Sequence, residues 1–419
     1  MTARTAPPET TEPRTPVPRR VLIALCATQI TSWGILFYTL PVLLGDIRAD
    51  TGWSTAGIMG AFSTGLAVSA LAGIGAGHLL DRYGPRIVMT AGSVIATGAV
   101  LAIAVAPDLW WFTAAWMLSG AAQAGVLYKP AFAAITAWYG SDRVKALTIV
   151  TLAGGLASTV YAPLTATLAD HLDWRGVYLV LAAVLAASTI PLHAIALSPP
   201  WPGTRPADGR RQIDAPALRR KQIVLSPTFI ALAAAMALAA FAMSASNLYL
   251  VPLLTGRGMD TTTAAWALGI CGAGQLLGRI AYAPIANRTR PTVRTVAILA
   301  VAAATTFAVA ITAGPFALVF ATVIVLGAAR GAFTLLDATA VTDRWGPAGY
   351  GTLHGILSAP ATIAIALSPW AGAHLAAFTG GYPQMFAALA AMTASAAGIV
   401  LVERLPRRAR NRHRSGPRG

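Results

Sequence analysis

The stretch Gly77-His-Leu-Leu-Asp-Arg-Tyr-Gly-Pro-Arg86 is a polar interruption between two long apolar segments, 54–80 and 86–106. Roughly 20 helical residues cross a bilayer core, and both segments are long enough to do so. Glycine tolerates the backbone angles of a tight turn and the close approach of a neighbouring helix. The stretch is therefore predicted to be a short loop that joins two membrane-spanning helices.

The rest of the chain has the same apolar character. Of its 419 residues, 56% are hydrophobic and only 11% are charged, with a mean hydropathy of +0.63. A soluble protein of this size would carry about 25% charged residues. We therefore expect an all-α integral membrane protein with twelve transmembrane helices. The predicted spans are 20–43, 54–80, 86–106, 109–138, 145–168, 174–197, 227–254, 261–285, 292–313, 315–341, 349–376 and 381–403.

The basic residues predict the orientation. With the N-terminus inside, most of the 31 Lys and Arg residues fall in cytoplasmic segments, and only Arg48, Arg175 and Arg257 fall in outer loops. The positive-inside rule then places both termini in the cytoplasm. The excess of Arg over Lys favours a bacterial source, and the protein would then lie in the plasma (inner) membrane. The positive-inside rule also accounts for most of the net charge of +16, so we expect no nucleic-acid partner. The basic tail is expected to face anionic lipids at the cytoplasmic surface.

A polar segment divides the spans six and six, which predicts two pseudo-symmetric halves. The expected units are a disordered N-terminus 1–19, a first half 20–197, a central loop 198–226, a second half 227–403 and a basic tail 404–419. Three short matches recur at an offset of about 206 residues: 120–138 with 327–345, 162–163 with 368–369, and 81–82 with 287–288. Repeated six-helix halves are typical of secondary transporters.

The opening stretch also resembles a known signature. Gly77, Asp81, Arg82, Gly84 and Arg86 match the loop of the major facilitator superfamily, Gly-x-x-x-Asp-Arg-x-Gly-Arg-Arg/Lys, although proline stands where the family usually has the first basic residue of the final pair. An acid such as Asp81 can pair with cations across the cytoplasmic gate of its half. The resemblance implies a twelve-helix transporter.

A narrower resemblance is to the monocarboxylate transporter and oxalate/formate antiporter branch. The stretch 278–291 resembles the eighth helix of that branch, Ala-Arg-Pro-Ser-x-Gly-x-x-Ala-Asn, and 52–54, 173–175 and Tyr128 are also familiar there. The resemblance implies that Arg279 binds a carboxylate. Two departures leave the proton-coupling arrangement of the animal members open: Gln275 stands where the branch often has an acid, and the first span lacks a lysine.

Four charged residues, Lys129, Arg279, Arg330 and Asp337, lie inside predicted spans. A charge at mid-membrane costs about 2.5 kcal/mol or more, so it is rarely kept without a use. Three of the four are positive, which favours an interior for a small anion. A guanidinium holds a carboxylate through two parallel bonds, and we predict this role for Arg279, with Arg330 as a second contact. The alternatives are snorkelling of Arg279 to headgroups and pairing of Arg330 with a backbone carbonyl.

In the repeat alignment, Lys129 and Asp337 occupy corresponding depths on spans four and ten. We hypothesise a salt bridge between them that forms when the cytoplasmic side closes. Asp337 is also the predicted proton carrier and His354 the second candidate, because histidine changes charge near neutral pH. A purely structural role for Asp337 is the alternative.

Neutral side chains complete the predicted site. Tyr128, Gln123 and Gln275 are candidates for hydrogen bonds to a hydroxyl or keto group, and packing between helices is their alternative role. Further candidates for such bonds are Asn247 and Tyr249. The apolar wall is predicted from Trp33, Phe37 and Phe333.

Nothing in the sequence predicts an enzyme. It has no phosphate-cradling loop, nucleophile elbow or metal-ligand spacing, and its two cysteines indicate neither a disulfide nor a metal site.

We therefore predict a monomeric secondary transporter of small organic anions that needs no cofactor. It would work by alternating access, with proton symport favoured over exchange. One alternative is an exporter of a larger amphipathic compound or antibiotic, acting as a drug:proton antiporter. Another is a non-transporting membrane receptor on the same fold.

Overall fold

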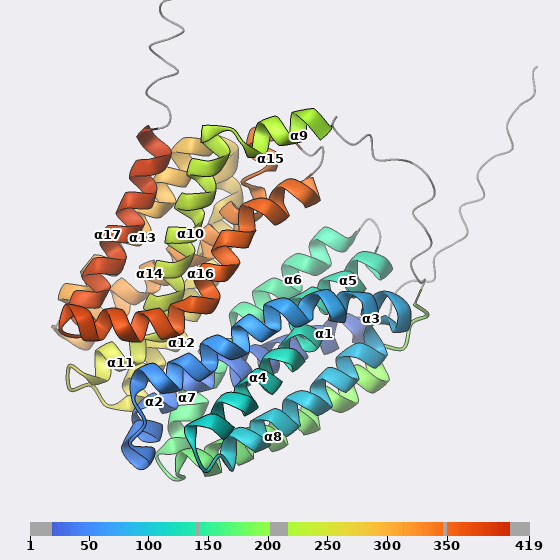
Figure 1. Ribbon diagram of the computed structural model, residues 1–419, viewed down its shortest axis with the longest axis vertical. Coiled ribbons are helices and arrows are strands. Elements are labelled where there is room, and N and C mark those ends of the chain that lie inside the picture. Colours follow the sequence, from blue (N-terminus) through green and yellow to red (C-terminus); the bar gives the residue numbers. More distant parts are fainter. Residues whose placement is uncertain (1–18, 140–141, 202–216, 313, 347–349, 403–419) are drawn as a thin grey trace, which may run out of the picture.

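The computed structural model describes residues 19–139, 142–201, 217–312, 314–346 and 350–402, and every regular element in them is a helix (Figure 1). The predicted N-terminal leader, the basic tail and most of the central loop lie outside these residues. The first part of the chain forms α1 (Arg19–Trp33), η1 (Gly34–Tyr38), α2 (Thr39–Thr51), α3 (Thr55–Ala104), α4 (Leu109–Val126), α5 (Tyr128–Tyr139), α6 (Arg143–Gly155), α7 (Ala157–Ala169), α8 (Trp174–Pro191) and η3 (Leu192–Ala196).

The second part of the chain has a matching set of long helices. It forms α9 (Ala217–Val224), α10 (Pro227–Leu248), α11 (Leu250–Thr255), α12 (Thr261–Arg288), α13 (Pro291–Ile311), α14 (Phe316–Thr339), α15 (Thr342–Trp345), α16 (Tyr350–Thr379) and α17 (Tyr382–Val402). Short elements such as α5 and α11 continue a span after a local break, whereas η1 is a π-helical turn inside the continuous first span.

All twelve predicted spans are helical. Among the described residues, ten helical segments are long and apolar enough to cross a membrane by length and composition. The other two predicted spans are 109–138, which forms α4 and α5, and 261–285, which forms most of α12. Both of these spans carry polar candidates, Gln123 and Lys129 on one and Gln275 and Arg279 on the other. Candidates also lie on the more apolar spans, among them Arg330 and Asp337 on α14.

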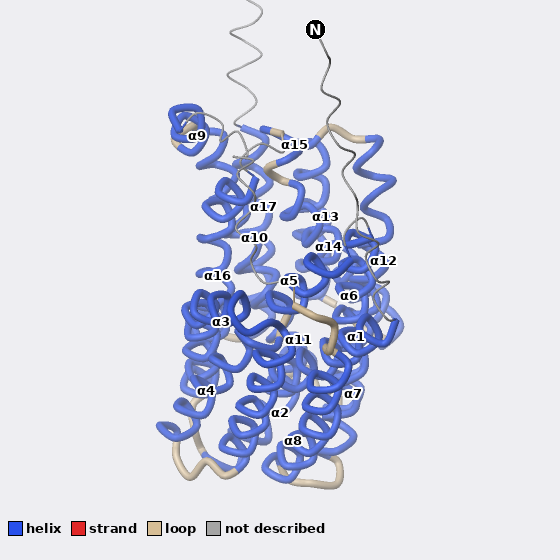
Figure 2. The backbone as a smooth tube through the Cα atoms, turned by 90° about the vertical axis from the view of Figure 1, so that its right-hand side faces the viewer, coloured by secondary structure: helices blue, strands red, loops and turns tan. Residues whose placement is uncertain are grey.

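The helices form two bundles, α1–α8 and α10–α17, which meet at one end and diverge at the other (Figures 1 and 2). The start of α1 and the end of α17 lie where the bundles diverge (Figure 1). Hydrogen bonds join them where they meet: the Thr159 hydroxyl donates to the Gly269 carbonyl over 2.8 Å, and the Trp370 amide donates to the Ser63 hydroxyl over 3.0 Å. We call these two regions the joined end and the divergent end.

One close helix contact occurs at corresponding positions in both bundles. In the first, Gly120 on α4 lies against the backbone carbonyl of Gly65 on α3, so closely that a Cβ would overlap it. In the second, Gly327 on α14 lies in the same way against the carbonyl of Cys271 on α12. Gly65 and Cys271, like Gly120 and Gly327, are about 206 residues apart. The contact supports the repeat inferred from the sequence.

A second repeated feature involves outer-loop arginines. Arg175 donates to the carbonyls of Ala104 and Ala106 over 3.0 and 2.8 Å, and thereby caps the C-terminus of α3. Arg257 caps α13 through the corresponding carbonyls, those of Ala310 and Thr312. A cation is favourable at the negative end of a helix, where carbonyls lack intrahelical partners. Two of the three arginines expected in outer loops, Arg175 and Arg257, thus cap helices.

The signature loop forms the predicted turn inside α3. Gly84 has a φ of 77°, in the left-handed region that favours glycine, and Pro85 restarts the helix. The Trp201 ring packs over Gly84, and its Nε1 donates to the Asp81 carbonyl over 3.2 Å. At Gly77, in contrast, a Cβ would meet no atom within 4 Å. Gly84 therefore serves the turn as expected, whereas the close packing expected at Gly77 is not seen.

Candidate functional site

The candidate site is built where spans of the first bundle are interrupted. Span four breaks between α4 and α5, because Pro130 has no N–H to donate to the Val126 carbonyl. The buried Gln29 side chain on α1 supplies the missing donor, over 2.7 Å. The break places Tyr128 and Lys129 at the start of α5. Interrupted helices expose backbone groups in the protein interior, where transporters commonly bind their substrates.

Arg279 on α12 reaches across to the first bundle. Its Nη1 donates to the Thr151 carbonyl on α6 over 2.5 Å, and its guanidinium interacts with the Tyr128 hydroxyl. Its Nε is buried and has no hydrogen-bond partner among the described residues. Buried donors in proteins nearly always have a partner, so this N–H is a candidate contact for a substrate group. The structure thus brings together Arg279 and Tyr128, two of the candidate substrate-binding residues.

Aromatic rings surround the Tyr128 end of this contact. The Trp33 ring centroid lies 5.1 Å from that of Tyr128, and Phe37 lies 5.6 Å from Trp33. Phe132 stacks on the other side of Tyr128 at 5.0 Å. Trp33 and Phe37 therefore occupy the predicted apolar wall. Phe333, the third predicted member, packs in clusters of the second bundle instead.

Gln275 on α12 and Arg330 on the adjacent α14 lie nearer the joined end than Arg279. Gln275 is one turn before Arg279, on the same face of the helix, and its Nε2 is buried with no partner in the described chain. Arg330 reaches the thiol of Cys271, and its Nη1 is also buried without a partner there. Cys271 is two turns from Arg279, about 12 Å along the helix axis. Arg330 thus contacts α12 two turns from Arg279.

The remaining charged candidates do not form the predicted salt bridge in this conformation. The Lys129 side chain is exposed and lies against α3, where its Nζ would be 2.8 Å from a Cβ at Gly73. Asp337 lies instead 3.9 Å from His354 Nε2, between α14 and α16. The predicted bridge belongs to a state in which the divergent end is closed, so it stays a prediction. The new observation is that Asp337 and His354, both predicted proton carriers, are neighbours.

Three neutral candidates lie apart from Arg279. Gln123 is buried and donates to Ser119 Oγ on its own helix over 3.3 Å. The Tyr249 hydroxyl, between α10 and α11, donates to the Pro369 carbonyl on α16 and thus links these helices. Asn247 is 2% exposed, and both its amide atoms lack partners in the described chain.

Sequence reasoning missed the contribution of α6. Thr151 supplies the carbonyl that holds Arg279, and Gly154 and Gly155 lie directly beside the Tyr128 and Arg279 side chains. The adjacent glycines in an apolar span were a detectable signal, because glycine in a helix interior costs stability. Gln29 was missed as well, and its signal was a buried amide in the first span.

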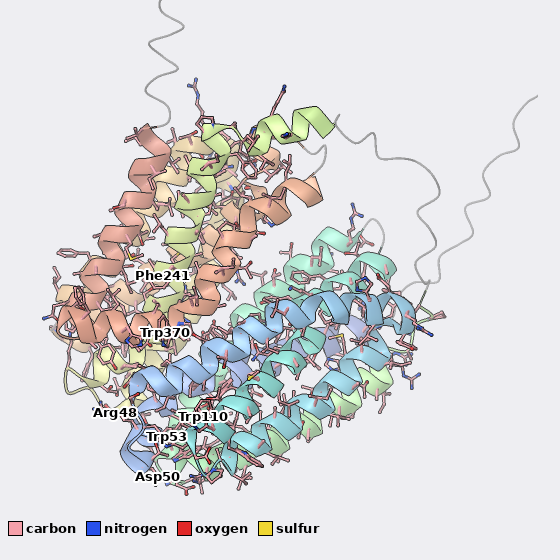
Figure 3. The ribbon with its side chains drawn as sticks, viewed as in Figure 1. Arg48, Asp50, Trp53, Trp110, Phe241 and Trp370 are labelled. Atoms are coloured by element: carbon pink, nitrogen blue, oxygen red, sulfur yellow. The ribbon has the colours of Figure 1, made fainter. Side chains whose placement is uncertain are left out.

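A lateral pocket lies elsewhere, near the joined end. It has a volume of about 480 Å³ and is lined by α3, α4 and α16, with Trp110 and Trp370 on its rim (Figure 3). Its hydroxyls are engaged: Thr64 and Thr113 donate to carbonyls of their own helices, and Ser63 accepts from Trp370. It contains none of the charged candidates.

Comparison with known families decides the identity. The Major Facilitator Superfamily model matches residues 22–352. The chain belongs to the major facilitator superfamily. It is therefore a multi-pass membrane transporter with the major facilitator fold, and not an enzyme.

The relatives of the chain are distant in sequence. Monocarboxylate transporter 13 of Bos taurus is 26% identical over 263 residues, and monocarboxylate transporter 11 of Homo sapiens is 26% identical over 260 residues. Each alignment covers 62% of this chain. The chain spans only 57% of the length of the first relative and 53% of the length of the second. A bacterial homologue of the human lysosomal transporter Spinster, solved in an inward-facing and occupied conformation, has a TM-score of 0.72 at 18% identity. That match covers 93% of this chain and 97% of the other, and it supports the fold.

Proposed function

We propose that this transporter carries small organic anions, monocarboxylates above all. The observation that carries the proposal is the buried Nε of Arg279, which has no partner among the described residues although the same guanidinium is held by Thr151 and Tyr128. The N–H groups of a guanidinium form a planar fork that suits a carboxylate. The names of the monocarboxylate transporter relatives support the same substrate class.

The surroundings of Arg279 fit a short, partly apolar acid. Tyr128 contacts the guanidinium and the Trp33 ring packs on Tyr128, while the unpaired Nε2 of Gln275 lies one helical turn before Arg279. A carboxylate on Arg279 would place a short carbon chain near these rings. A hydroxyl or keto oxygen next to the carboxylate would then find donors in Gln275 and Tyr128. Lactate and pyruvate have this arrangement of groups.

We further propose that the two bundles, 20–197 and 227–403, rock about this site and that the segment 198–226 links them. The positive-inside rule assigns the divergent end to the cytoplasm of a bacterial cell, with both termini on that side of the plasma membrane. The described conformation then corresponds to the inward-open state of a monomer. Arg279 lies about 27 Å along α12 from its first residue at the joined end, well toward the divergent end.

Proton coupling is proposed to run through Asp337 and His354. At 3.9 Å the two groups are within ion-pair distance but not hydrogen-bonded, so a protonated His354 would stabilise the Asp337 carboxylate. Asp337 Oδ1 is buried without a partner in the described chain. The pair lies in the second bundle, as Arg279 does. A proton taken up at Asp337 would offset the charge of an incoming carboxylate.

The test of the proposed function is counterflow in proteoliposomes. Vesicles containing the purified chain would be loaded with lactate, pyruvate, acetate, oxalate or longer monocarboxylic acids, and the entry of the same labelled acid would be followed. Saturable counterflow of at least one short acid is expected. Failure with every anion would reject the proposal. Binding without counterflow would indicate a receptor instead.

A further inference from the structure

Two adjacent glycines at the end of α6 shape the space around Arg279 and Tyr128. A Cβ at Gly155 would lie 2.6 Å from Arg279 Nη1 and 3.2 Å from Leu276 Cδ1. A Cβ at Gly154 would lie 2.9 Å from Tyr128 Cζ and closer still to the hydroxyl. Both distances are shorter than normal carbon contacts. The two donors of the site therefore occupy space that exists only because these positions have no side chain.

The atoms involved are the ends of long side chains, and this distinguishes the pair from other tight glycines. Gly278 and Gly331 also leave no room for a Cβ, but there the obstructing atoms belong to the backbone of Ala328 and Gln275. A methyl group at Gly278 or Gly331 would push two helices apart. A methyl at Gly154 or Gly155 would instead displace a hydroxyl or a guanidinium and leave the helices in place.

The same end of α6 orients the guanidinium. Thr151 lies four residues before the last residue of α6, and its carbonyl accepts from Arg279 Nη1. With Nη1 held there, the opposite edge of the guanidinium carries Nε–H and one Nη2–H in parallel. Nε is the atom that has no partner in the described chain. The α6 contact thus leaves one complete fork available to an anion.

We propose that Gly154 and Gly155 are positioning residues for a carboxylate. Gly155 and the Thr151 carbonyl aim the Nε–Nη2 edge of Arg279 at the substrate, and Gly154 places the Tyr128 hydroxyl beside it. Because α6 and α12 belong to different bundles, this orientation depends on their contact. The inference rests on the proposed anion transport and adds the residues that set the geometry of its binding site.

The test uses Gly155→Ala and Gly154→Ala in full-length protein reconstituted into proteoliposomes, with Gly98→Ala as the matched control. A Cβ at Gly98, on α3, would meet no atom within 4 Å. The initial rate of labelled lactate counterflow would be measured over a range of lactate concentrations. Gly155→Ala is expected to raise KM about tenfold or more, because a charge-assisted contact is misaligned, with little change in kcat. Gly98→Ala should leave both unchanged.

A double-variant measurement separates positioning from general damage. Tyr128→Phe removes the hydroxyl that a methyl at Gly154 would displace. Gly154→Ala should therefore raise KM less in the Tyr128→Phe background than in the wild type. Melting temperatures within a few degrees of wild type would show that both glycine variants fold.

The outcomes distinguish the two proposals. If the wild type carries lactate and both glycine variants keep the wild-type KM, the positioning role is overturned and anion transport stands. A fall in kcat at constant KM would also overturn it. If the wild type shows no counterflow of any carboxylate, both the anion proposal and this inference are rejected.

Discussion

The two bundles share a scaffold but differ in chemistry. Gly120 and Gly327 make the same backbone contact at corresponding positions, and Arg175 and Arg257 cap the same helix ends. The charged groups are not repeated in this way: Arg279, Arg330, Asp337 and His354 all lie in the second bundle. The first bundle contributes Tyr128, the Trp33 ring and a backbone carbonyl.

This difference separates what stabilises the fold from what forms the site. Contacts between α3 and α4, or between α12 and α14, lie inside one bundle and are needed in every conformation. The Arg279 contact, in contrast, joins the two bundles. The repeat does not reproduce it, because the first bundle has no arginine at the position that corresponds to Arg279. Changes to repeated features should therefore act on stability, and changes to unrepeated ones on transport.

The largest expected effect is at the repeated glycine contact. Gly120→Val and Gly327→Val each place a side chain into a backbone carbonyl of the adjacent helix. Each should lower the free energy of unfolding by about 3 kcal/mol. Thermal unfolding of detergent-solubilised protein and the yield of monodisperse protein would measure this, with Gly98→Ala as control. A severe loss for one variant and none for the other would contradict the equivalence of the two contacts.

The next effect concerns the unrepeated acid. Asp337→Asn should abolish accumulation of substrate driven by a proton gradient while sparing exchange down a substrate gradient, because the amide cannot carry a proton. His354→Gln, which removes the neighbouring imidazole, should weaken proton-driven uptake as well. His374→Gln is the control, since His374 packs on the Trp370 ring instead. Proton-driven uptake that survives in Asp337→Asn would make the residue structural.

The smallest effect is expected at the capping arginines. Arg175→Gln and Arg257→Gln each remove a cation from a helix C-terminus, and each should cost about 1–2 kcal/mol of stability. Neither residue lies near Arg279, so the KM for substrate should stay at the wild-type value. Thermal unfolding and counterflow kinetics of the same preparations would check both points. A raised KM without loss of stability would mean that a cap takes part in transport.

The helices were predictable because the signal is local. Twelve apolar segments, the turn at Gly84 and the repeat near Gly120 and Gly327 can each be found in a short stretch of sequence. The fold that they predicted is confirmed. The close packing expected at Gly77 is not seen, since the space beside that residue is open in this conformation.

The site was only partly predictable, since it depends on how distant helices pack. Arg279 and Tyr128 were identified as candidates by residue type and resemblance, and the structure brings them together. The role of Thr151 is that of a backbone carbonyl, which no side-chain pattern reveals. The repeat alignment placed Lys129 at the depth of Asp337. It could not show which way the Lys129 side chain points, because that depends on the break before α5. The roles of all these residues in transport stay predictions.

The most direct test of the central claim compares Arg279→Lys with Arg330→Lys. Both changes keep the charge and remove the guanidinium fork, and the two arginines lie on facing helices of the same bundle. The KM for lactate counterflow should rise about tenfold to a hundredfold in Arg279→Lys, and by no more than about threefold in Arg330→Lys. An unchanged KM in Arg279→Lys would contradict the carboxylate fork and favour export of a larger amphipathic compound.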